Sequence, residues 1–313
     1  MSLAMERDRS LDGLKFILIF LVIFVHVKYI NPYGTQLMKV IHSFVMPMFI
    51  LLSGYFTKVT TWAHCRQWTK KILLLYLLFD SLNVLLSMWL HHKGWEYFFI
   101  GLVKPVNIMW YLLSLIWWRL ILQTLSWLGL RIDWRLFVGG IVLSILVGFV
   151  PLGHELSFQR TFAWFPFFLL GYLLRQWGGI EWIRSRKAIS FIPFLLIAFY
   201  LSQKLPIYMP VNGYSSMYKM VIRVLQMSNA FVICLCLLRL IPPSFASRFG
   251  WLGAHSLYFY VYHTLPIVAQ RFYFEQHNIV VTPFAAFAIV VGYVLVISLM
   301  AKIRFFRLLL FQK

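Results

Sequence analysis

The sequence predicts an all-α integral membrane protein, a polytopic helical bundle with about ten transmembrane helices. Of its 313 residues, 61% are hydrophobic and only 12% are charged, whereas soluble domains carry roughly 25% charged residues. Apolar runs of about 20 residues, the length that crosses a bilayer, recur from end to end of the chain. These runs are continuous and lack the two-residue alternation of barrel strands, so helices are expected.

The apolar runs place the individual spans. We expect them at residues 14–30, 37–56, 72–90, 108–128, 136–152, 162–177, 188–202, 221–241, 251–271 and 283–301. Pro47, Pro166 and Pro266 lie inside or near spans, where neighbouring helices can satisfy the carbonyl groups that a proline leaves free. The segment Trp95–Val103 is too short to cross and is expected to lie at the interface or to re-enter. Because the loops are short, residues 1–313 are expected to form a single transmembrane domain.

The net charge of +20 has a membrane explanation. In a soluble protein it would suggest nucleic acid as a partner. Here the basic residues gather at span ends, where lipid headgroups and the topology rule account for them. Membrane lipids are therefore expected partners, and nucleic acid is not. A bias of roughly two to one in Lys and Arg between the two sides places both termini in the cytoplasm.

The three cysteines do not suggest a metal or a disulfide framework. Cys234 and Cys236 are two residues apart in an apolar run and point to different faces of a helix. Neither they nor Cys65 has zinc-ligand spacing. No metal is expected.

Three ionisable residues lie on one face of the first predicted span. Lys15 and His26 are eleven residues apart, which is three turns and about 20°, and about 16 Å along the axis. Asp12 lies one turn below Lys15. Ionisable groups in a bilayer are costly and often mark function. Two interpretations stay open here, because His26 can also be a packing histidine and Asp12 with Lys15 can be a helix-start pair.

Further polar residues occur inside later spans. His42 in the second span and His263 in the ninth are expected near the depth of His26. Asp80 and Arg119 are expected at comparable depth in the third and fourth spans. They can pair, which would lower the cost of burying both charges, and a structural pair is favoured over a catalytic one.

Two other features have a structural and a functional interpretation. Trp110 and Tyr111 at the start of the fourth span are typical of aromatic residues at the membrane interface. The loop after the second span ends in a basic cluster formed by Arg66, Lys70 and Lys71. The topology rule alone explains that cluster, but a polyanionic ligand would suit it as well.

Five motifs resemble, in order, those of the membrane acyltransferase-3 family. They are Arg9–Lys15 with His26, Met46–Phe49 with Ser53–Tyr55, Met109–Leu112, Phe165–Tyr172, and Gly250–Gly253 with Ser256–Tyr258 and Tyr262–His263. The resemblance extends from about residue 9 to residue 270 and is closest to the sugar O-acetylase branch that includes fucose 4-O-acetylases. Two positions depart from it. Val45 stands where that branch often has a histidine, and Trp68 stands where the family often has the first of two arginines three residues apart.

The resemblance implies a membrane-bound O-acyltransferase. Its donor co-substrate would be acetyl-CoA, or another acyl-CoA, from the cytoplasm. Its acceptor would be a hydroxyl of a glycan or lipid-linked sugar of the cell envelope, and its location the bacterial inner membrane. His26 would be the general base or the acyl carrier, with Lys15 and Asp12 holding the donor or shaping its entrance.

The resemblance also implies two supporting groups of residues. The first would bind the acyl-CoA donor: Arg66, Lys70, Lys71 and Ser53. The second would form a supporting polar core: His42, Asp80, Asn83, Trp110, Tyr111, Arg119 and His263.

Two other classes of protein compete with the acyltransferase. A transporter or flippase of a glycan or small polar substrate also has many spans with inward polar groups, although no internal repeat is visible in this sequence. A non-catalytic scaffold or sensor would not need Lys15, His26, Asp80 and Arg119 inside the bundle. Binding and consumption of acetyl-CoA would distinguish an acyltransferase from a transporter and from a scaffold.

Overall fold

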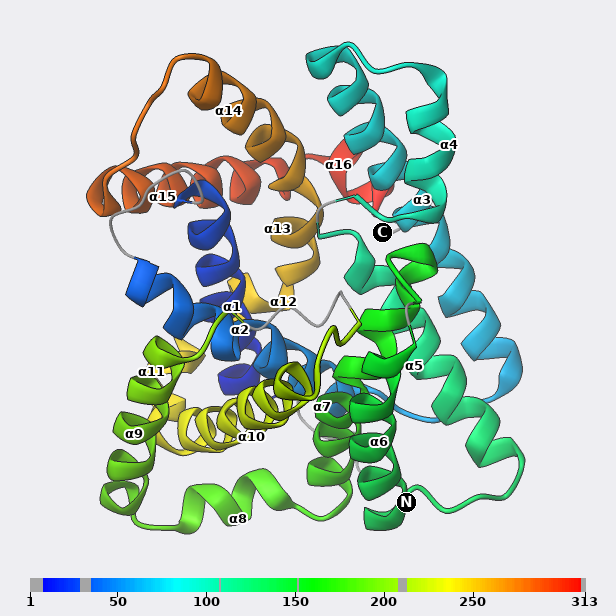
Figure 1. Ribbon diagram of the computed structural model, residues 1–313, viewed down its shortest axis with the longest axis vertical. Coiled ribbons are helices and arrows are strands. Elements are labelled where there is room, and N and C mark those ends of the chain that lie inside the picture. Colours follow the sequence, from blue (N-terminus) through cyan, green and yellow to red (C-terminus); the bar gives the residue numbers. More distant parts are fainter. Residues whose placement is uncertain (1–7, 29–34, 107, 151, 208–212, 311–313) are drawn as a thin grey trace.

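The computed structural model describes residues 8–28, 35–106, 108–150, 152–207 and 213–310, and these residues form helices and no strands (Figure 1). The first half contains α1 (Arg9–Lys28), α2 (Thr35–Phe56), α3 (Trp62–His91), α4 (Trp95–Val103), α5 (Trp110–Trp127), α6 (Trp134–Leu146), η1 (Val147–Phe149) and η2 (Glu155–Ser157). The second half contains α7 (Phe158–Gln176), α8 (Gly179–Ser185), η3 (Ala188–Phe191), α9 (Ile192–Lys204), α10 (Met217–Leu240), α11 (Pro243–Ser247), α12 (Gly250–Ala254), α13 (Ser256–Tyr262), α14 (Thr264–Gln276), α15 (Pro283–Met300) and α16 (Arg304–Leu309).

The predicted all-α membrane class is confirmed. Each predicted span coincides with helical structure, and α1, α2, α3, α10 and α15 are each long and apolar enough to cross a bilayer. Helix α8 and the segment 188–204 are joined by a bend of 104°, and together they are apolar enough to form a sixth, broken span. The total of ten stays a prediction. Residues 29 and 30 of the first predicted span and residue 151 of the fifth lie outside the described part of the chain.

The start of the third helix was predicted ten residues too late. Helix α3 begins at Trp62, because the hydroxyl of Thr61 accepts a hydrogen bond from the backbone N–H of His64 and caps the helix. The basic cluster expected in a loop therefore lies on the first turns of a helix. Hydropathy missed these turns because charged residues interrupt the apolar pattern there.

The ninth predicted span is broken into three pieces, α12, α13 and α14, which meet at His255 and His263. Pro266, in the first turn of α14, has no N–H to donate to the carbonyl of Tyr262, so the regular ladder cannot continue through this point. His263 sits at that break. The helices α2 and α7 differ, since each continues through its internal proline, Pro47 and Pro166.

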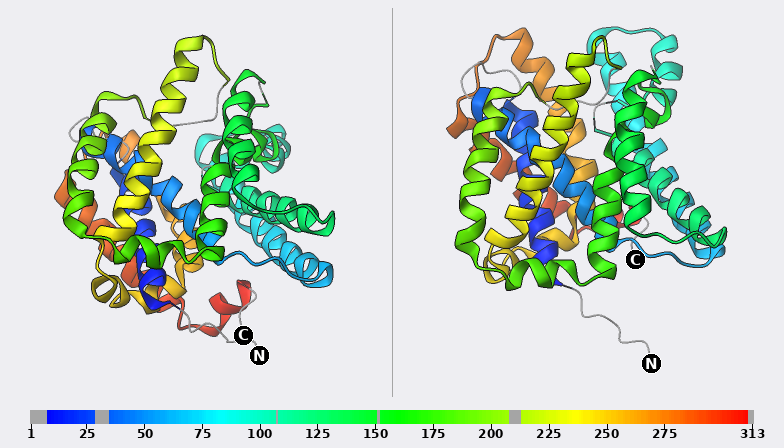
Figure 2. Two further views of the ribbon diagram at one scale, coloured as in Figure 1. Left: turned by 90° about the horizontal axis from the view of Figure 1, so that it is seen from below. Right: turned by 60° about the horizontal axis from the view of Figure 1, so that its bottom comes forward.

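Helix α1 lies inside the bundle and packs against α2, α11, α12 and α15. The right-hand view of Figure 2 shows the start of α1 and α8 at the lower end, and α4 and α14 at the upper end. Close approach of α1 to α12 depends on Gly253, where an added Cβ would lie 1.6 Å from the carbonyl oxygen of Asp12. The polar residues of α1 are thereby held against the α12–α14 segment.

Helices α2 and α7 pack with their backbones in contact. A Cβ at Gly171 would lie 1.8 Å from the carbonyl oxygen of Leu51, and a Cβ at Gly54 would lie 1.9 Å from that of Phe168. We expect Gly171→Ala to lower the free energy of unfolding by about 1–3 kcal/mol, the usual cost of overpacking. Denaturant titration of the purified protein in detergent micelles measures this.

Gly139→Ala is the matched control, since Gly139 is helical and has nothing within 4 Å of its Cβ position. Alanine there should be neutral or stabilising by up to about 1 kcal/mol. Equal effects of the two substitutions would contradict the close α2–α7 packing.

Candidate functional site

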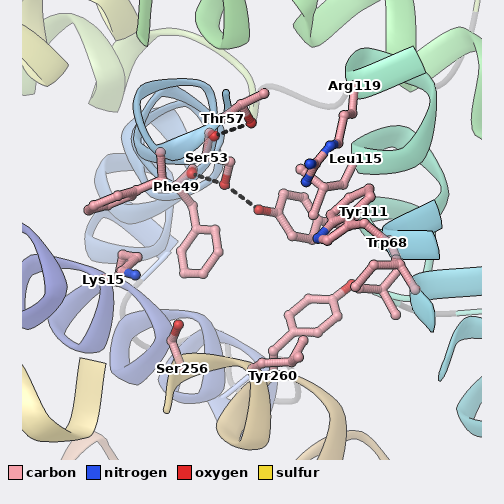
Figure 3. Close-up of a pocket in the computed structure, with 14 residues that line it drawn as sticks. Lys15, Phe49, Ser53, Thr57, Trp68, Tyr111, Leu115, Arg119, Ser256 and Tyr260 are labelled. Carbon is pink, nitrogen blue, oxygen red and sulfur yellow. Dashed lines mark hydrogen bonds between the residues drawn. The ribbon is translucent and has the colours of Figure 1, made fainter. Parts of the chain in front are cut away.

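A cavity of about 280 Å³ opens between α1, α2, α3, α5 and α13 (Figure 3). We call it the Lys15 cavity. It is lined by Lys15, Phe49, Ser53, Phe56, Thr57, Trp68, Ile72, Tyr111, Leu112, Leu115, Arg119, Ser256, Leu257 and Tyr260. Two of these side chains are cations, and most of the others are aromatic or aliphatic. The cavity is therefore an apolar slot with positive charge on opposite walls.

The predicted contact between Lys15 and Asp12 is confirmed. The Nζ atom of Lys15 lies 2.6 Å from a carboxylate oxygen of Asp12, and it also lies 4.3 Å from the centre of the Phe56 ring. Asp12 is buried and Lys15 remains partly exposed to the cavity. This pair orients a cation at the cavity wall.

Arg119 lies on the opposite side of the cavity, stacked on Trp68. The guanidinium carbon is 4.2 Å from the centre of the Trp68 ring. Such stacking holds a guanidinium in place while its N–H groups stay available. Trp68 stood out in the sequence only as a departure from the family pattern, and it was not expected to line a cavity.

The expected pair of Asp80 with Arg119 is wrong. Asp80 accepts a hydrogen bond from the backbone N–H of Val106 at 3.0 Å and forms no ion pair with Arg119 among the described residues. Both Trp68 and Asp80 lie on α3, twelve residues and about 18 Å apart along the axis. Because Arg119 stacks on Trp68, it lies near the depth of Trp68 and not near that of Asp80.

Ser53 and Tyr111 meet between the two cations. Their hydroxyl groups are hydrogen-bonded, and Ser53 also donates to the carbonyl of Phe49 at 2.8 Å. Tyr111 packs on Tyr260, with ring centres 5.4 Å apart. Both Tyr111 and its neighbour Trp110 are buried in the bundle, so the interpretation of these two as interface aromatics is wrong.

The upper part of α1 borders a second, much smaller cavity. We call it the histidine chamber, and it is lined by His26, Ile108, His263, Thr264, Ile267, Val268 and Arg271. Its free volume of about 10 Å³ holds about one water-sized group. The rings of His26 and His263 have their centres 6.0 Å apart.

The structure brings together two of the three histidines that were expected at a similar depth. His26 and His263 both line the chamber, whereas His42 of α2 is not among its lining residues. The guanidinium of Arg271 is 3.0 Å from Nδ1 of His26. Arg271 had no such role in the sequence analysis, because a single arginine near a predicted span end is typical of the topology signal.

One polar residue of α3, Asn83, supports the chamber. Asn83 is fully buried and donates from Nδ2 to the carbonyl of Phe79 at 2.7 Å and to the hydroxyl of Thr264 at 3.1 Å. Thr264 follows His263 directly, so Asn83 holds the start of α14 against α3. The predicted supporting role of Asn83 thus has a geometric basis.

A thin wall separates the Lys15 cavity from the histidine chamber. The ring of Tyr260 lines the cavity, and its hydroxyl donates a hydrogen bond to the carbonyl of Ile108, which lines the chamber. The two spaces therefore meet at Tyr260. Lys15 and His26, which line the two spaces, lie eleven residues apart on α1, about 16 Å along its axis.

The basic cluster lies outside the Lys15 cavity. Arg66, Lys70 and Lys71 are exposed on α3, whereas Trp68 and Ile72, four residues apart, share the face that lines the cavity. Lys71 flanks that face by one residue. Arg66 instead borders a separate cavity with Trp62, Ala63, Thr69 and Leu120.

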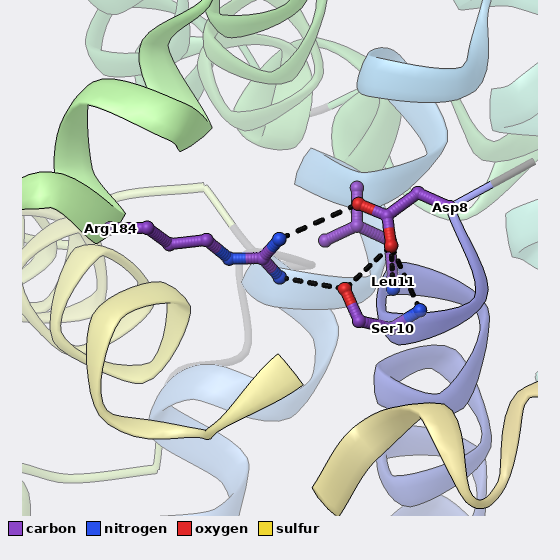
Figure 4. A network of polar contacts seen from close by, with 4 residues as sticks. All are labelled: Asp8, Ser10, Leu11 and Arg184. Atoms are coloured by element: carbon purple, nitrogen blue, oxygen red, sulfur yellow. Dashed lines mark hydrogen bonds and ion pairs between the residues drawn. The ribbon is translucent and has the colours of Figure 1, made fainter. Parts of the chain in front are cut away.

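The lower end of α1 is anchored by a network that the sequence analysis did not identify (Figure 4). Asp8 caps the helix by accepting from the backbone N–H of Ser10 at 2.8 Å and of Leu11 at 3.2 Å. Arg184 of α8 donates to the Ser10 hydroxyl at 3.0 Å and lies 3.5 Å from Asp8. The cap and the contact with α8 fix the position of α1 along its axis, and therefore the position of Lys15 at the cavity wall.

Among the described residues, no group of three His, Cys, Asp or Glu side chains is placed to hold a metal ion. A family model described as "Acyltransferase domain" matches residues 8–302. Searches of curated proteins and of solved structures found no match.

Proposed function

The chain belongs to the acyltransferase-3 family, and we propose that this membrane acyltransferase moves an acetyl group from acetyl-CoA to a hydroxyl of a glycan or lipid-linked sugar. One observation carries the proposal. Helix α1 borders both the Lys15 cavity, through Lys15, and the histidine chamber, through His26, and the two spaces meet at one wall, formed by Tyr260 and Ile108. A donor with an anionic head and a long, thin reactive arm suits such a site.

The Lys15 cavity has the chemistry for the donor. Lys15 and Arg119 offer ammonium and guanidinium groups to phosphates, and the aromatic and aliphatic walls suit the uncharged pantetheine arm. Ser53 and Tyr111 add hydroxyl groups between the two cations. The exposed cluster of Arg66, Lys70 and Lys71 would attract the polyanion from the cytoplasm before it enters.

The histidine chamber has the chemistry for the acceptor. It has room for a hydroxyl-sized group beside two imidazoles and one guanidinium. An imidazole can remove the proton of an attacking hydroxyl, and a fixed donor can stabilise the negative charge that develops on the carbonyl oxygen. His26 and His263 thus stand where the thioester would arrive after passing Tyr260.

Two measurements test this function: binding and consumption of acetyl-CoA by the purified protein, and mass spectrometry of surface glycans. The purified protein in lipid nanodiscs should bind acetyl-CoA, and it should release free thiol when methyl glycosides of fucose, glucose and galactose are supplied. Surface glycans from cells with and without the gene should differ by one acetyl unit. A transporter would neither bind nor consume acetyl-CoA, so the absence of both signals would reject the acyltransferase.

The donor route also predicts the orientation of α3 in the membrane. Thr61 is exposed at the start of α3 and should face the cytoplasm with the basic cluster. Gly94 lies beyond the other end of α3 in open space and should face outward. In a variant without the native cysteines, an impermeant thiol reagent should label Gly94→Cys in intact cells, and Thr61→Cys only after permeabilisation. The reverse pattern would reject the cytoplasmic donor route.

A further inference from the structure

The hydrogen bond of His263 determines which of its ring nitrogens carries the proton. Its Nδ1 atom lies 2.6 Å from the carbonyl oxygen of Phe259, one helical turn earlier. A carbonyl oxygen can only accept a hydrogen bond, so Nδ1 must donate. A neutral imidazole protonated on Nδ1 has its lone pair on Nε2. His263 therefore offers a proton acceptor at Nε2.

Arg271 imposes the opposite state on His26. Its Nη2 atom lies 3.0 Å from Nδ1 of His26, and its Nε atom lies 3.3 Å from the His26 carbonyl oxygen. A guanidinium has donors and no acceptor, so Nδ1 of His26 must accept with its lone pair. The proton of the neutral ring is then on Nε2, and His26 offers a hydrogen-bond donor.

We infer that His263 is the general base of the transfer and that His26 is a hydrogen-bond donor to the reacting carbonyl group. This inference rests on the proposed function and reverses the role that the sequence suggested for His26. The two rings line the same chamber with their centres 6.0 Å apart. A base and a carbonyl-oxygen donor on either side of a hydroxyl-sized space are the two groups that an acyl transfer requires.

The transfer step follows from these two states. The acceptor hydroxyl oxygen attacks the thioester carbon, and its proton passes to Nε2 of His263. The carbonyl oxygen, which gains negative charge, accepts a hydrogen bond from Nε2 of His26. The carbon–sulfur bond then breaks, and His263 returns the proton to the thiolate. The products are an ester and the free thiol of coenzyme A, and both histidines regain their starting states.

The backbone around His263 supports its role as the base. His263 lies at the break between α13 and α14, buried with 1% of its surface exposed. The Phe259 carbonyl and the Asn83–Thr264 hydrogen bond hold the ring and the following turn in place. The side chain is thus fixed before any substrate arrives, as a base that must meet a hydroxyl requires.

Another histidine provides a matched control. His255 makes the same type of bond, with Nδ1 2.8 Å from the carbonyl of Trp251 one turn earlier. It lies eight residues before His263 in the α12–α14 segment and does not line the chamber. A substitution at His255 therefore reproduces the loss of the turn contact without touching the proposed base.

The experiment replaces His26, His255 and His263 with glutamine, one at a time, and compares the three variants with the wild type. Glutamine can donate a hydrogen bond but cannot take up a proton at neutral pH. His263→Gln should lower the rate of acetyl-CoA-dependent thiol release, with the methyl glycosides above as acceptors, by about 10²–10⁴-fold. His26→Gln should cost less than about tenfold, because the amide can still donate to the carbonyl oxygen. His255→Gln should leave the rate unchanged, and all three variants should bind acetyl-CoA as the wild type does.

The reverse ranking would overturn the inference. If His26→Gln loses as much activity as His263→Gln, or more, His26 is the base. Should His263→Gln prove unstable, His263→Asn keeps a donor for the Phe259 carbonyl and must show the same loss; near-normal turnover in that variant would reject His263 as the base. A wild-type protein that neither binds acetyl-CoA nor releases thiol would instead reject the proposed function, and the inference with it.

Discussion

Replacing His26 with alanine is expected to lower acetyl transfer by about 10²–10³-fold, the usual cost of removing one donor to a developing oxyanion. Alanine deletes the Nε2–H that Arg271 maintains, and it leaves the guanidinium without its imidazole partner. Acetyl-CoA affinity should not change, because Lys15, in the proposed donor site, lies about 16 Å from His26 along α1. Thiol release gives the transfer rate, and calorimetry gives the affinity.

The same variant tests whether His26 is only a packing residue. A packing histidine would, when replaced, reduce the yield of monodisperse protein and lower the activity of the remainder little. We expect the opposite: a normal yield, a normal acetyl-CoA dissociation constant and a large loss of rate. A loss of folded protein that accounts for the whole loss of activity would restore the packing interpretation.

Replacing Arg119 with glutamine is expected to weaken acetyl-CoA binding by about 10–100-fold. Hydrogen bonds to charged groups contribute about 1.5–3 kcal/mol, and 1.4 kcal/mol corresponds to a factor of ten in affinity. Arg119 makes no ion pair among the described residues, so its removal leaves no buried counter-ion. Lys15 is a poorer target, because its loss would disturb the buried carboxylate of Asp12.

The exposed basic cluster is the comparison for Arg119. Replacing Arg66, Lys70 and Lys71 together with glutamine should slow association and reduce its salt dependence, while changing the dissociation constant only a few-fold. Stopped-flow binding at several ionic strengths separates the two effects. A larger loss of affinity in the triple variant than in Arg119→Gln would place the phosphates on the surface of α3 and outside the Lys15 cavity.

The parts of the site that depend on spacing within one helix could be predicted from the sequence. The spacing of Asp12, Lys15 and His26 placed them on one face of the first helix, and the Lys15–Asp12 ion pair confirms the lower part of that face. The similar depth of His26 and His263, which line one chamber, followed from counting residues inward from span ends. Such estimates succeed because an α-helix rises a fixed distance per residue.

Contacts between helices were harder to predict. Asp80 and Arg119 were paired by depth, which was estimated from a third span at residues 72–90. In the structure Arg119 instead stacks on Trp68, twelve residues before Asp80 on α3. Composition could not reveal this contact, since an arginine–tryptophan stack leaves no periodic pattern in a sequence.

The sequence by itself determined that this protein is a bundle of membrane helices, since apolar length and charge deficit follow from composition alone. It also determined which polar residues share the first helix, since that depends only on spacing. Tertiary structure alone decided that Arg271 faces Nδ1 of His26 and that His263 turns Nδ1 to Phe259. Hydrogen-bond partners select the protonated nitrogen of an imidazole, and those partners are brought to the two histidines by helix packing and by the break at His263.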